Sequence, residues 1–232
     1  MRTLAIIPAR SGSKRVPQKN IRRFLGKPLI NWTVEFATTI AWFDTIHVST
    51  DSREIADIAV NCGATAPYLR DASLATDTAT SIDVVLDVVD WYSRNGTSFD
   101  AIALLQPTSP VRRPHHWDRA REMIEQRGFD SAVGARSATT HPYLAMKARD
   151  DGSLQPFFPT ESRTLRSQDF PQAHYLNGTL YLARMEALKS ERSFMCGRCG
   201  LVSVEDEIEN IDIDTEADWA EAERIVSETI NP

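Results

Sequence analysis

The chain has 232 residues, a length that suits one α/β domain with at most a modest appendage. Hydrophobic residues make up 42% of it and charged residues 25%, which is typical of a soluble globular protein with a filled core. The formal net charge of −6 at pH 7 argues against nucleic acid or an anionic membrane as a partner. Because the chain has no apolar run of membrane-spanning length and no leader-like start, we expect a cytoplasmic protein.

Strand-like and helix-like patterns alternate through the first 135 residues. Short apolar runs predict strands at residues 4–8, 43–49, 66–69, 101–105 and 129–135. Helical patterns lie between them: after Pro28, from a cap at Asp51 to Gly63, along an apolar stripe from Ile82 to Val89, and over residues 114–126. This alternation indicates βαβ units, and therefore an α/β fold with a mainly parallel sheet flanked by helices.

The alternation breaks between residues 137 and 174, where Pro156, Pro159 and short polar stretches fit no further βα unit. We expect an inserted lid, or a hairpin arm that reaches a partner subunit. Residues 178–183 restore the order, residues 202–204 and 211–213 resemble further strands, and Thr215 with Asp218 begins a last helix. The prediction is one domain over residues 1–232, with residues 137–174 as an inserted dimerisation or lid arm.

A strongly basic loop stands directly behind the first predicted strand, in the stretch AIIPARSGSKRVPQKN at residues 5–20. Every charged residue from Arg10 to Lys27 is basic, and the first carboxylate of the chain is Glu35. The loop is neither a Walker A nor a GxGxxG sequence. Main-chain N–H groups and Lys/Arg side chains at the carboxyl end of a strand can nevertheless hold a triphosphate. The alternative is a solvated basic loop without a ligand.

A late acidic doublet, Asp212 and Asp214 in IDIDT, is the second candidate feature. Alternate residues of an extended segment point to the same face, so both carboxylates can meet one hard cation, and Mg²⁺ accepts one or two carboxylates together with water and phosphate oxygens. The alternative is that Asp214 or Thr215 merely caps the last helix. A haloacid dehalogenase-type phosphatase is set aside, because it requires a threonine where this chain has Glu216.

Cysteine and histidine give weak signals. The CxxC pair Cys196 and Cys199 has no second Cys pair and no nearby histidine to complete a zinc site. His115 and His116 stand at a predicted helix start, where capping or surface exposure is the simpler interpretation.

Five ordered motifs together resemble the acylneuraminate cytidylyltransferase family, the CMP-sialic acid synthetases. They are the stretch from Ile6 to Asn20, LRDASLATDTATSID, LLQPTSPVR, YLNGTLYL and IDIDTEADW, and the resemblance runs from Leu4 to about Val226. It implies a nucleotide-diphospho-sugar transferase-like α/β fold, usually a homodimer whose subunits reach across with an inserted arm. It also implies a reaction in which CTP and a nine-carbon 2-keto acid sugar give the CMP-sugar and pyrophosphate, with magnesium (or manganese) as the metal.

The resemblance carries over residue by residue onto matching positions. It implies a CTP loop at Arg10, Ser13, Lys14, Lys19 and Asn20, cytidine recognition by Arg70 and Ser81, sugar contacts at Gln106, Lys147 and Arg166, and metal binding by Asp212 and Asp214. Of these, Arg10, Lys19 and the two aspartates are the predicted catalytic residues. Tyr175-Leu176 departs from the arginine and proline of many relatives, so the choice of acyl sugar stays open.

Several alternatives remain at this point. The substrate can be a sialic, legionaminic, pseudaminic or Kdo-type sugar. A catalytically silent nucleotide- or sugar-binding module is the non-enzyme alternative, although both charged pairs, Arg10/Lys19 and Asp212/Asp214, are present. A nucleic-acid-binding protein is disfavoured, because the basic patch is short and not interleaved with aromatic residues. In-line phosphoryl transfer depends mainly on positioning and charge neutralisation, and no general base is evident.

Overall fold

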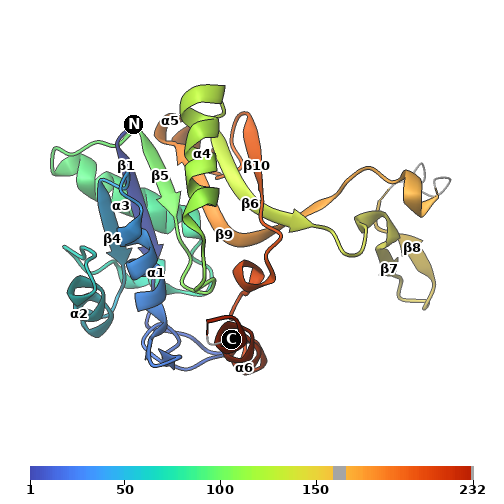
Figure 1. The fold of residues 1–232 in the computed structure, drawn as a ribbon, viewed down its shortest axis with the longest axis horizontal. Helices are drawn as coiled ribbons and strands as arrows, with labels where there is room; N and C mark the ends of the chain where they lie inside the picture. Colours follow the sequence, from blue (N-terminus) through green and yellow to red (C-terminus); the bar gives the residue numbers. More distant parts are fainter. Residues whose placement is uncertain (159–165, 231–232) are drawn as a thin grey trace.

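The computed structural model describes residues 1–158 and 166–230, and its centre is a six-stranded sheet between two layers of helices (Figure 1). The strands lie in the order β10-β6-β9-β5-β1-β4. In chain order they are β1 (Thr3–Pro8), β4 (Thr45–Ser49), β5 (Ala101–Leu104), β6 (Ser131–Ser137), β9 (His174–Arg184) and β10 (Cys199–Ser203).

The sheet is mainly parallel, as predicted. β1 pairs in parallel with β4 and with β5, and β10 pairs in parallel with β6. The exception is β9, which runs antiparallel between β5 and β6. A crossover helix would return the chain to the edge of the sheet where the parallel strands begin. The arm instead returns the chain at the edge where β6 ends, so β9 runs in the opposite direction to β6.

Alternate residues of β1 are buried on opposite faces of the sheet. Ala5 and Ile7 pack into a cluster with α1, α2 and α4, whereas Leu4 and Ile6 pack into a cluster with α3 and α5. Both faces are therefore covered, which is why β1 is an unbroken apolar run. The helices are α1 (Leu29–Thr39), α2 (Arg53–Asn61), α3 (Ser81–Arg94), α4 (Pro114–Arg127), α5 (Met185–Glu191) and α6 (Glu216–Ile230).

A third apolar cluster joins the two ends of the chain. Val16 and Phe24 from the region of the basic loop pack with Trp219 and Val226 of α6, and the small strands β2 (Arg23–Phe24) and β3 (Lys27–Pro28) pair in this region. The ring of Phe24 meets that of Trp219 edge-on, with centroids 5.5 Å apart. This packing sets the basic loop beside the segment that carries the acidic doublet.

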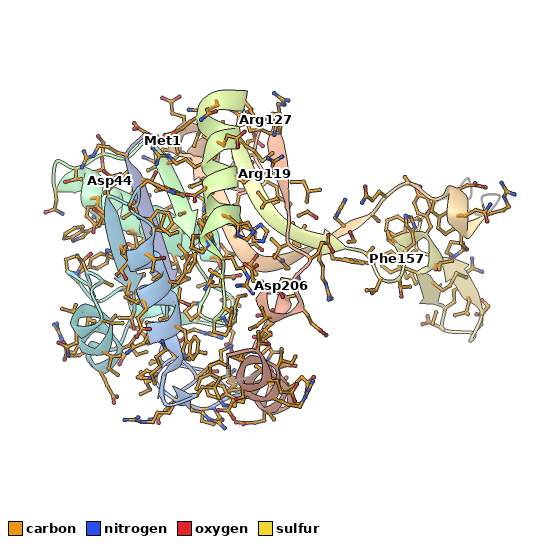
Figure 2. The ribbon with its side chains drawn as sticks, viewed as in Figure 1. Met1, Asp44, Arg119, Arg127, Phe157 and Asp206 are labelled. Atoms are coloured by element: carbon orange, nitrogen blue, oxygen red, sulfur yellow. The ribbon has the colours of Figure 1, made fainter. Side chains whose placement is uncertain are left out.

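An arm leaves the sheet between the end of β6 and the start of β9 and projects away from the body (Figure 1). It carries the antiparallel pair β7 (Met146–Ala148) and β8 (Leu154–Pro156), and two short 3₁₀ turns, η2 (Pro142–Leu144) and η4 (Ser167–Asp169). Figure 2 shows Phe157 on this arm, apart from the sheet. Pro159, one of the residues that mark the predicted insertion, lies outside the described residues.

Three local predictions are wrong. Residues 66–69 form no strand: the chain makes a single parallel bridge, His47 to Thr65, and Pro67 then offers no N–H for a ladder. Residues 211–213 are not a strand either, because Ile211 and Ile213 bury themselves in the third cluster instead of joining the sheet. The N-cap of α2 is Ser52, whose hydroxyl accepts from the N–H of Ile55.

Among the described residues, no helix combines the length and the apolar composition that a bilayer crossing demands.

Candidate active site

The basic loop follows β1 at the carboxyl end of that strand, and two side chains fix its shape. The amide of Asn20 donates to the carbonyl oxygen of Arg10 at 2.9 Å, which closes the loop on itself. The carboxylate of Asp51 accepts from the N–H of Ser11 at 2.8 Å and from its hydroxyl at 2.6 Å. Asp51, predicted as a helix cap, therefore anchors the loop.

Six of the predicted site residues line one cleft of about 230 Å³. They come from four separate regions: the basic loop, the segment before η1 (Ala72–Ala75), the start of α3 and the end of β5. These residues are Arg10, Lys19, Asn20, Arg70, Ser81 and Gln106.

Arg70 presents a guanidinium to this cleft from a buried position, with 6% of its surface exposed. Burial lowers the pKa of Arg70, and the charge of Asp51 opposes that shift. Within the described part of the chain, the Nε of Arg70 has no hydrogen-bond partner. A buried donor of this kind gains from an acceptor on a ligand.

Ser81 reaches the cleft because α3 begins there. Thr80 and Asp83 form a capping box, in which the Thr80 hydroxyl accepts from the N–H of Asp83 and the Asp83 carboxylate accepts from the N–H of Thr80. The positive end of the helix dipole at this terminus favours a polar or anionic ligand.

A second depression of about 410 Å³ continues the cleft past the basic loop. Arg10, Lys19 and Asn20 line both parts, so the two form one continuous groove. The second part adds three predicted residues and one that was not predicted to act there: Ser13, Lys14, Asp214 and Arg15.

Two carboxylates already pair with the cations of this groove. Asp77 contacts Arg10 at 2.8 Å and Lys14 at 2.6 Å, and hydrogen bonds from Lys14 and Arg10 lower the pKa of Asp77. Asp214 contacts Arg15 at 2.8 Å and Lys19 at 3.2 Å. Sequence reasoning missed Asp77, although it lies inside the motif LRDASLATDTATSID.

Lys19 links the basic loop to the acidic segment. Its Nζ donates to the main-chain carbonyl of Ile213 at 2.9 Å as well as to Asp214. Lys19 and Asp214, almost 200 residues apart in the chain, therefore line the same groove.

Asp212 lines a neighbouring depression of about 310 Å³, together with Arg136 and Asp218. Asp212 is exposed to solvent; desolvation by the protein around it raises the pKa of its carboxyl group, a hydrogen bond from Thr108 opposes the rise, and the charge of Asp214 adds to it. A carboxylate that is repelled by a neighbouring carboxylate gains from a nearby cation.

The cap of α6 is formed by Thr215 and Asp218 and not by the carboxylate of Asp214. Thr215 and Asp218 cap α6 reciprocally: the N–H of Asp218 donates to the Thr215 hydroxyl at 3.2 Å, and the N–H of Thr215 donates to the Asp218 carboxylate at 2.7 Å. The carboxylate of Asp214 points instead to Arg15 and Lys19. Asp212 and Asp214 supply carboxylate oxygens, the donor type that a hard cation prefers, but they line different depressions. No cluster of three or more His, Cys, Asp or Glu side chains with metal-binding geometry exists in residues 1–158 and 166–230.

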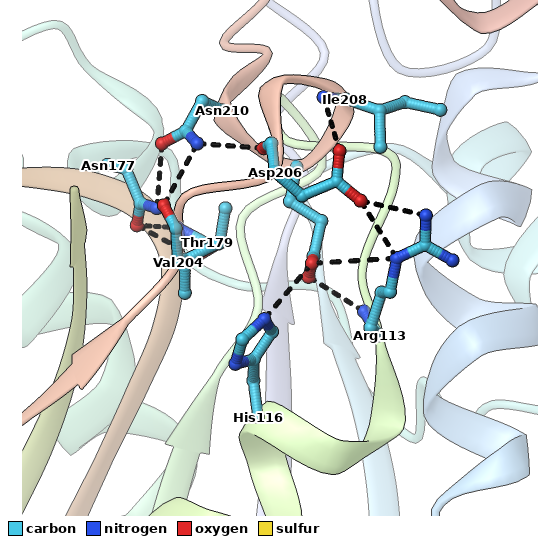
Figure 3. A network of polar contacts seen from close by, with 9 residues as sticks. Arg113, His116, Asn177, Thr179, Val204, Asp206, Ile208 and Asn210 are labelled. Carbon is cyan, nitrogen blue, oxygen red and sulfur yellow. Dashed lines mark hydrogen bonds and ion pairs between the residues drawn. The ribbon is translucent and has the colours of Figure 1, made fainter. Parts of the chain in front are cut away.

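A polar network docks the segment before the doublet onto the start of α4 (Figure 3). Glu209, at the end of η5 (Glu207–Asn210), is only 2% exposed. Its carboxylate accepts from the N–H of Arg113 at 2.8 Å and lies 3.2 Å from Nε2 of His116. Burial raises the pKa of Glu209 to about 7. On the other side, Asn210 accepts from the amide of Asn177 at 3.0 Å.

The two predicted residues of the arm do not line the groove. Lys147 lies in β7 and is exposed, and Arg166 pairs with Asp169 at 2.8 Å.

The two cysteines of the CxxC pair differ in their exposure to solvent: Cys196 is buried and Cys199 is exposed.

A family model described as Cytidylyltransferase matches residues 4–229 of the chain. The chain belongs to this cytidylyltransferase family.

Curated relatives in the family differ in their sugar. The chain is 37% identical over 97% of its length to the CMP-N,N'-diacetyllegionaminic acid synthase of Legionella pneumophila, covering 97% of that protein. It is 33% identical over 82% of its length to the pseudaminic acid cytidylyltransferase of Campylobacter jejuni, covering 82% of that protein. It is 33% identical over 94% of its length to the N-acylneuraminate cytidylyltransferase of Streptococcus agalactiae, of which it spans only 52%.

Two solved structures share the cytidylyltransferase fold. A CMP-2-keto-3-deoxy-manno-octonic acid synthetase complexed with CTP superposes with a TM-score of 0.70 at 17% identity, covering 99% of this chain and 100% of the other. The 4-diphosphocytidyl-2C-methyl-D-erythritol synthase of Anaerococcus prevotii gives 0.68 at 14% identity, covering 97% and 96%. The expected Rossmann-like, nucleotide-sugar transferase type of α/β fold is therefore confirmed.

Proposed function

We propose that this protein transfers CMP from CTP to the anomeric hydroxyl of a nine-carbon 2-keto acid sugar and releases pyrophosphate. The observation that carries the proposal is the continuous groove, in which the cations of the basic loop lie between the start of α3 and the acidic segment. The family assignment and the named activities of the relatives support the same reaction.

The nucleotide occupies the basic half of the groove in this proposal. The triphosphate is held by Arg10, Lys14 and Lys19, which exchange their contacts with Asp77 and Asp214 for contacts with phosphate oxygens. Ser13 and Asn20 line the same part of the groove and add polar contacts. Arg70 and Ser81 face the cytidine part, where the spare Nε of Arg70 can find an acceptor.

The sugar's anomeric oxygen attacks the α-phosphorus of CTP. A bond forms between that oxygen and phosphorus, the bond from phosphorus to the bridging oxygen of pyrophosphate breaks, and its electron pair leaves with pyrophosphate. The hydroxyl proton passes to solvent. Arg10 and Lys19 stabilise the charge that grows on the leaving group, an effect that is strong in a partly desolvated groove.

Asp212 and Asp214 are the residues that would hold a divalent cation, for which we propose Mg²⁺. When bound, such an ion lowers the pKa of a coordinated hydroxyl and neutralises phosphate charge. Lys19 holds Asp214 in place for this role through its contacts with that carboxylate and with the Ile213 carbonyl.

The sugar lies on the side of Gln106, at the end of β5. Lys147 and Arg166 lie on the arm, where Leu154 and Phe157 are 63% and 66% exposed. We propose that the arm packs against a second copy of the chain, so that these two basic residues serve the partner's sugar. Sedimentation of the wild type against Phe157→Ser tests the dimer: the variant should shift toward monomer, and a wild-type monomer at micromolar concentration contradicts it.

The activity is tested by following pyrophosphate release from CTP and Mg²⁺ with a panel of keto sugars. Diacetyllegionaminic acid comes first, because that relative matches this chain over almost its full length; N-acetylneuraminic, pseudaminic and Kdo-type acids follow. Release with at least one sugar is expected. Tight CTP binding by calorimetry without release on any of them would contradict the proposal and indicate a binding protein.

A further inference from the structure

Arg112 is a buried cation that no part of the proposed reaction uses. Only 7% of its surface is exposed, and burial lowers its pKa to about 9, with the charge of Glu209 opposing the shift. Removing a guanidinium from water is costly unless its donors are satisfied. What Arg112 contacts therefore indicates why the fold retains it.

The three hydrogen bonds that Arg112 makes within the described part of the chain join separate elements. One terminal nitrogen donates to the carbonyl oxygen of Gln106 at 2.6 Å, and Nε donates to the carbonyl oxygen of Thr179 at 3.0 Å. The other terminal nitrogen donates to the Thr33 hydroxyl of α1 at 3.2 Å. Gln106 follows the end of β5 and lines the groove, whereas Thr179 lies in the middle of β9.

Those two carbonyls stand where the ladder between β5 and β9 stops. The antiparallel register runs from Ala101 opposite Arg184 to Leu104 opposite Tyr181. Continued by two residues, it would set Gln106 opposite Thr179, but the ladder ends before that pair. The forked guanidinium donates to both carbonyls and so takes the place of the missing ladder bonds.

β9 also departs from β6 at this point. The register of the two strands shifts between Val133 and Ala135, which leaves an irregularity in β9 at residues 177–179. Gly178 has φ +77°, and a Cβ there would lie 3.3 Å from Oε1 of Gln106. The side chain of Gln106 thus packs against the irregular part of β9, and both are tied to Arg112.

We propose that Arg112 is a positioning residue that holds Gln106 against the bulge of β9 and thereby orients Gln106 toward the sugar. This inference rests on the proposed function, in which Gln106 contacts the keto sugar. Arg112 does not line the groove, so it acts only through the main chain it holds. A lysine, a point charge on a flexible stem, cannot reproduce the planar fork.

Arg112→Lys is the test, and Arg184→Lys is its matched control. Arg184 also donates to two main-chain carbonyls, those of Phe129 and Ile124, but it is the last residue of β9 and lies away from Gln106. In Arg112→Lys we expect KM for the keto sugar to rise about tenfold, the loss typical of one hydrogen bond to a charged group, with KM for CTP within about twofold. Arg184→Lys should leave both KM values unchanged.

If Arg112→Lys folds poorly, Thr33→Val provides a second test. It removes the hydroxyl of α1 that accepts a hydrogen bond from Arg112 and leaves Arg112 itself in place. It should raise KM for the keto sugar in the same direction by a smaller factor. A parallel rise of both KM values in Arg112→Lys, or an equal change in Arg184→Lys, overturns the inference.

Hydrogen exchange separates this inference from the proposed function, because it needs no turnover. The peptide over residues 105–109 should exchange faster in Arg112→Lys and Thr33→Val than in the wild type and Arg184→Lys. If no keto sugar supports pyrophosphate release, the proposed function fails, and the hydrogen-exchange comparison alone then tests whether Arg112 positions Gln106. Equal exchange in all four proteins overturns the positioning role.

Discussion

Replacing Glu209 with glutamine should remove a pH dependence of stability that runs opposite to ordinary acid denaturation. The Glu209 carboxyl group is 2% exposed and faces Arg112, Arg113, His116 and Asp206. Its pKa is raised from 4.5 to about 7 by burial. Between those values the folded protein keeps a proton that the unfolded chain has released, so the free energy of unfolding falls as the pH rises.

The size of the effect follows from the two pKa values of Glu209. At roughly 1.4 kcal/mol for each pH unit, the interval from 4.5 to about 7 amounts to about 3 kcal/mol. Glutamine keeps the shape and can still accept from the N–H of Arg113, but it does not titrate. The free energy of unfolding of the variant relative to the wild type should therefore rise by about 3 kcal/mol between about pH 4.5 and about pH 8.

Urea unfolding of both proteins across this pH range measures the difference directly. Titrations that the two proteins share, such as that of His47, largely cancel in the subtraction. A difference in free energy that stays constant from about pH 5 to about pH 8 would refute the reasoning, because Glu209 would then have no titration in that interval.

Three further predictions concern His47, Lys19 and Asp214. Burial lowers the pKa of His47 from 6.5 to about 4, so the wild type should lose about 3 kcal/mol of stability as the pH falls through that interval, and His47→Gln should lose less by urea unfolding. Lys19→Ala should reduce kcat/KM for CTP about 100-fold with an unchanged circular dichroism spectrum; an unchanged rate removes Lys19 from the mechanism. Asp214→Asn should raise the Mg²⁺ concentration needed for half-maximal rate by about tenfold, whereas normal metal dependence at reduced Tm would assign Asp214 a structural role only.

The spacing of apolar residues correctly predicted the helices and strands that pack on the two buried faces of the central sheet. The apolar run of β1 and the stripes of α1, α3 and α4 were readable because both faces of the sheet are buried. The same signal failed at Ile211 and Ile213. Alternation reports that one face is buried, but it does not report whether the partner is a neighbouring strand or, as here, the side chains of Trp219 and Val226.

The groove itself could be predicted only in part. Basic side chains behind a strand and a late acidic doublet are visible in the sequence, and Lys19 does meet Asp214. Arg112 and Arg113, by contrast, are adjacent and identical in type, yet one is buried among main-chain carbonyls and the other pairs with Asp206 at the surface. Only the folded chain distinguishes them, as it does the contact of Asp77 with Arg10.

In the proposed nucleotide site, binding of the nucleotide would displace the carboxylates of Asp77 and Asp214 from their cations, an exchange of one anion for another. Each of the two carboxylates pairs with two basic side chains of the groove. A ligand must therefore carry enough negative charge to displace both carboxylates. We expect a triphosphate to displace both carboxylates and a single phosphate group to displace neither. We therefore expect the groove to sort nucleotides by the length of the phosphate chain, and to let go of its product once the pyrophosphate has left.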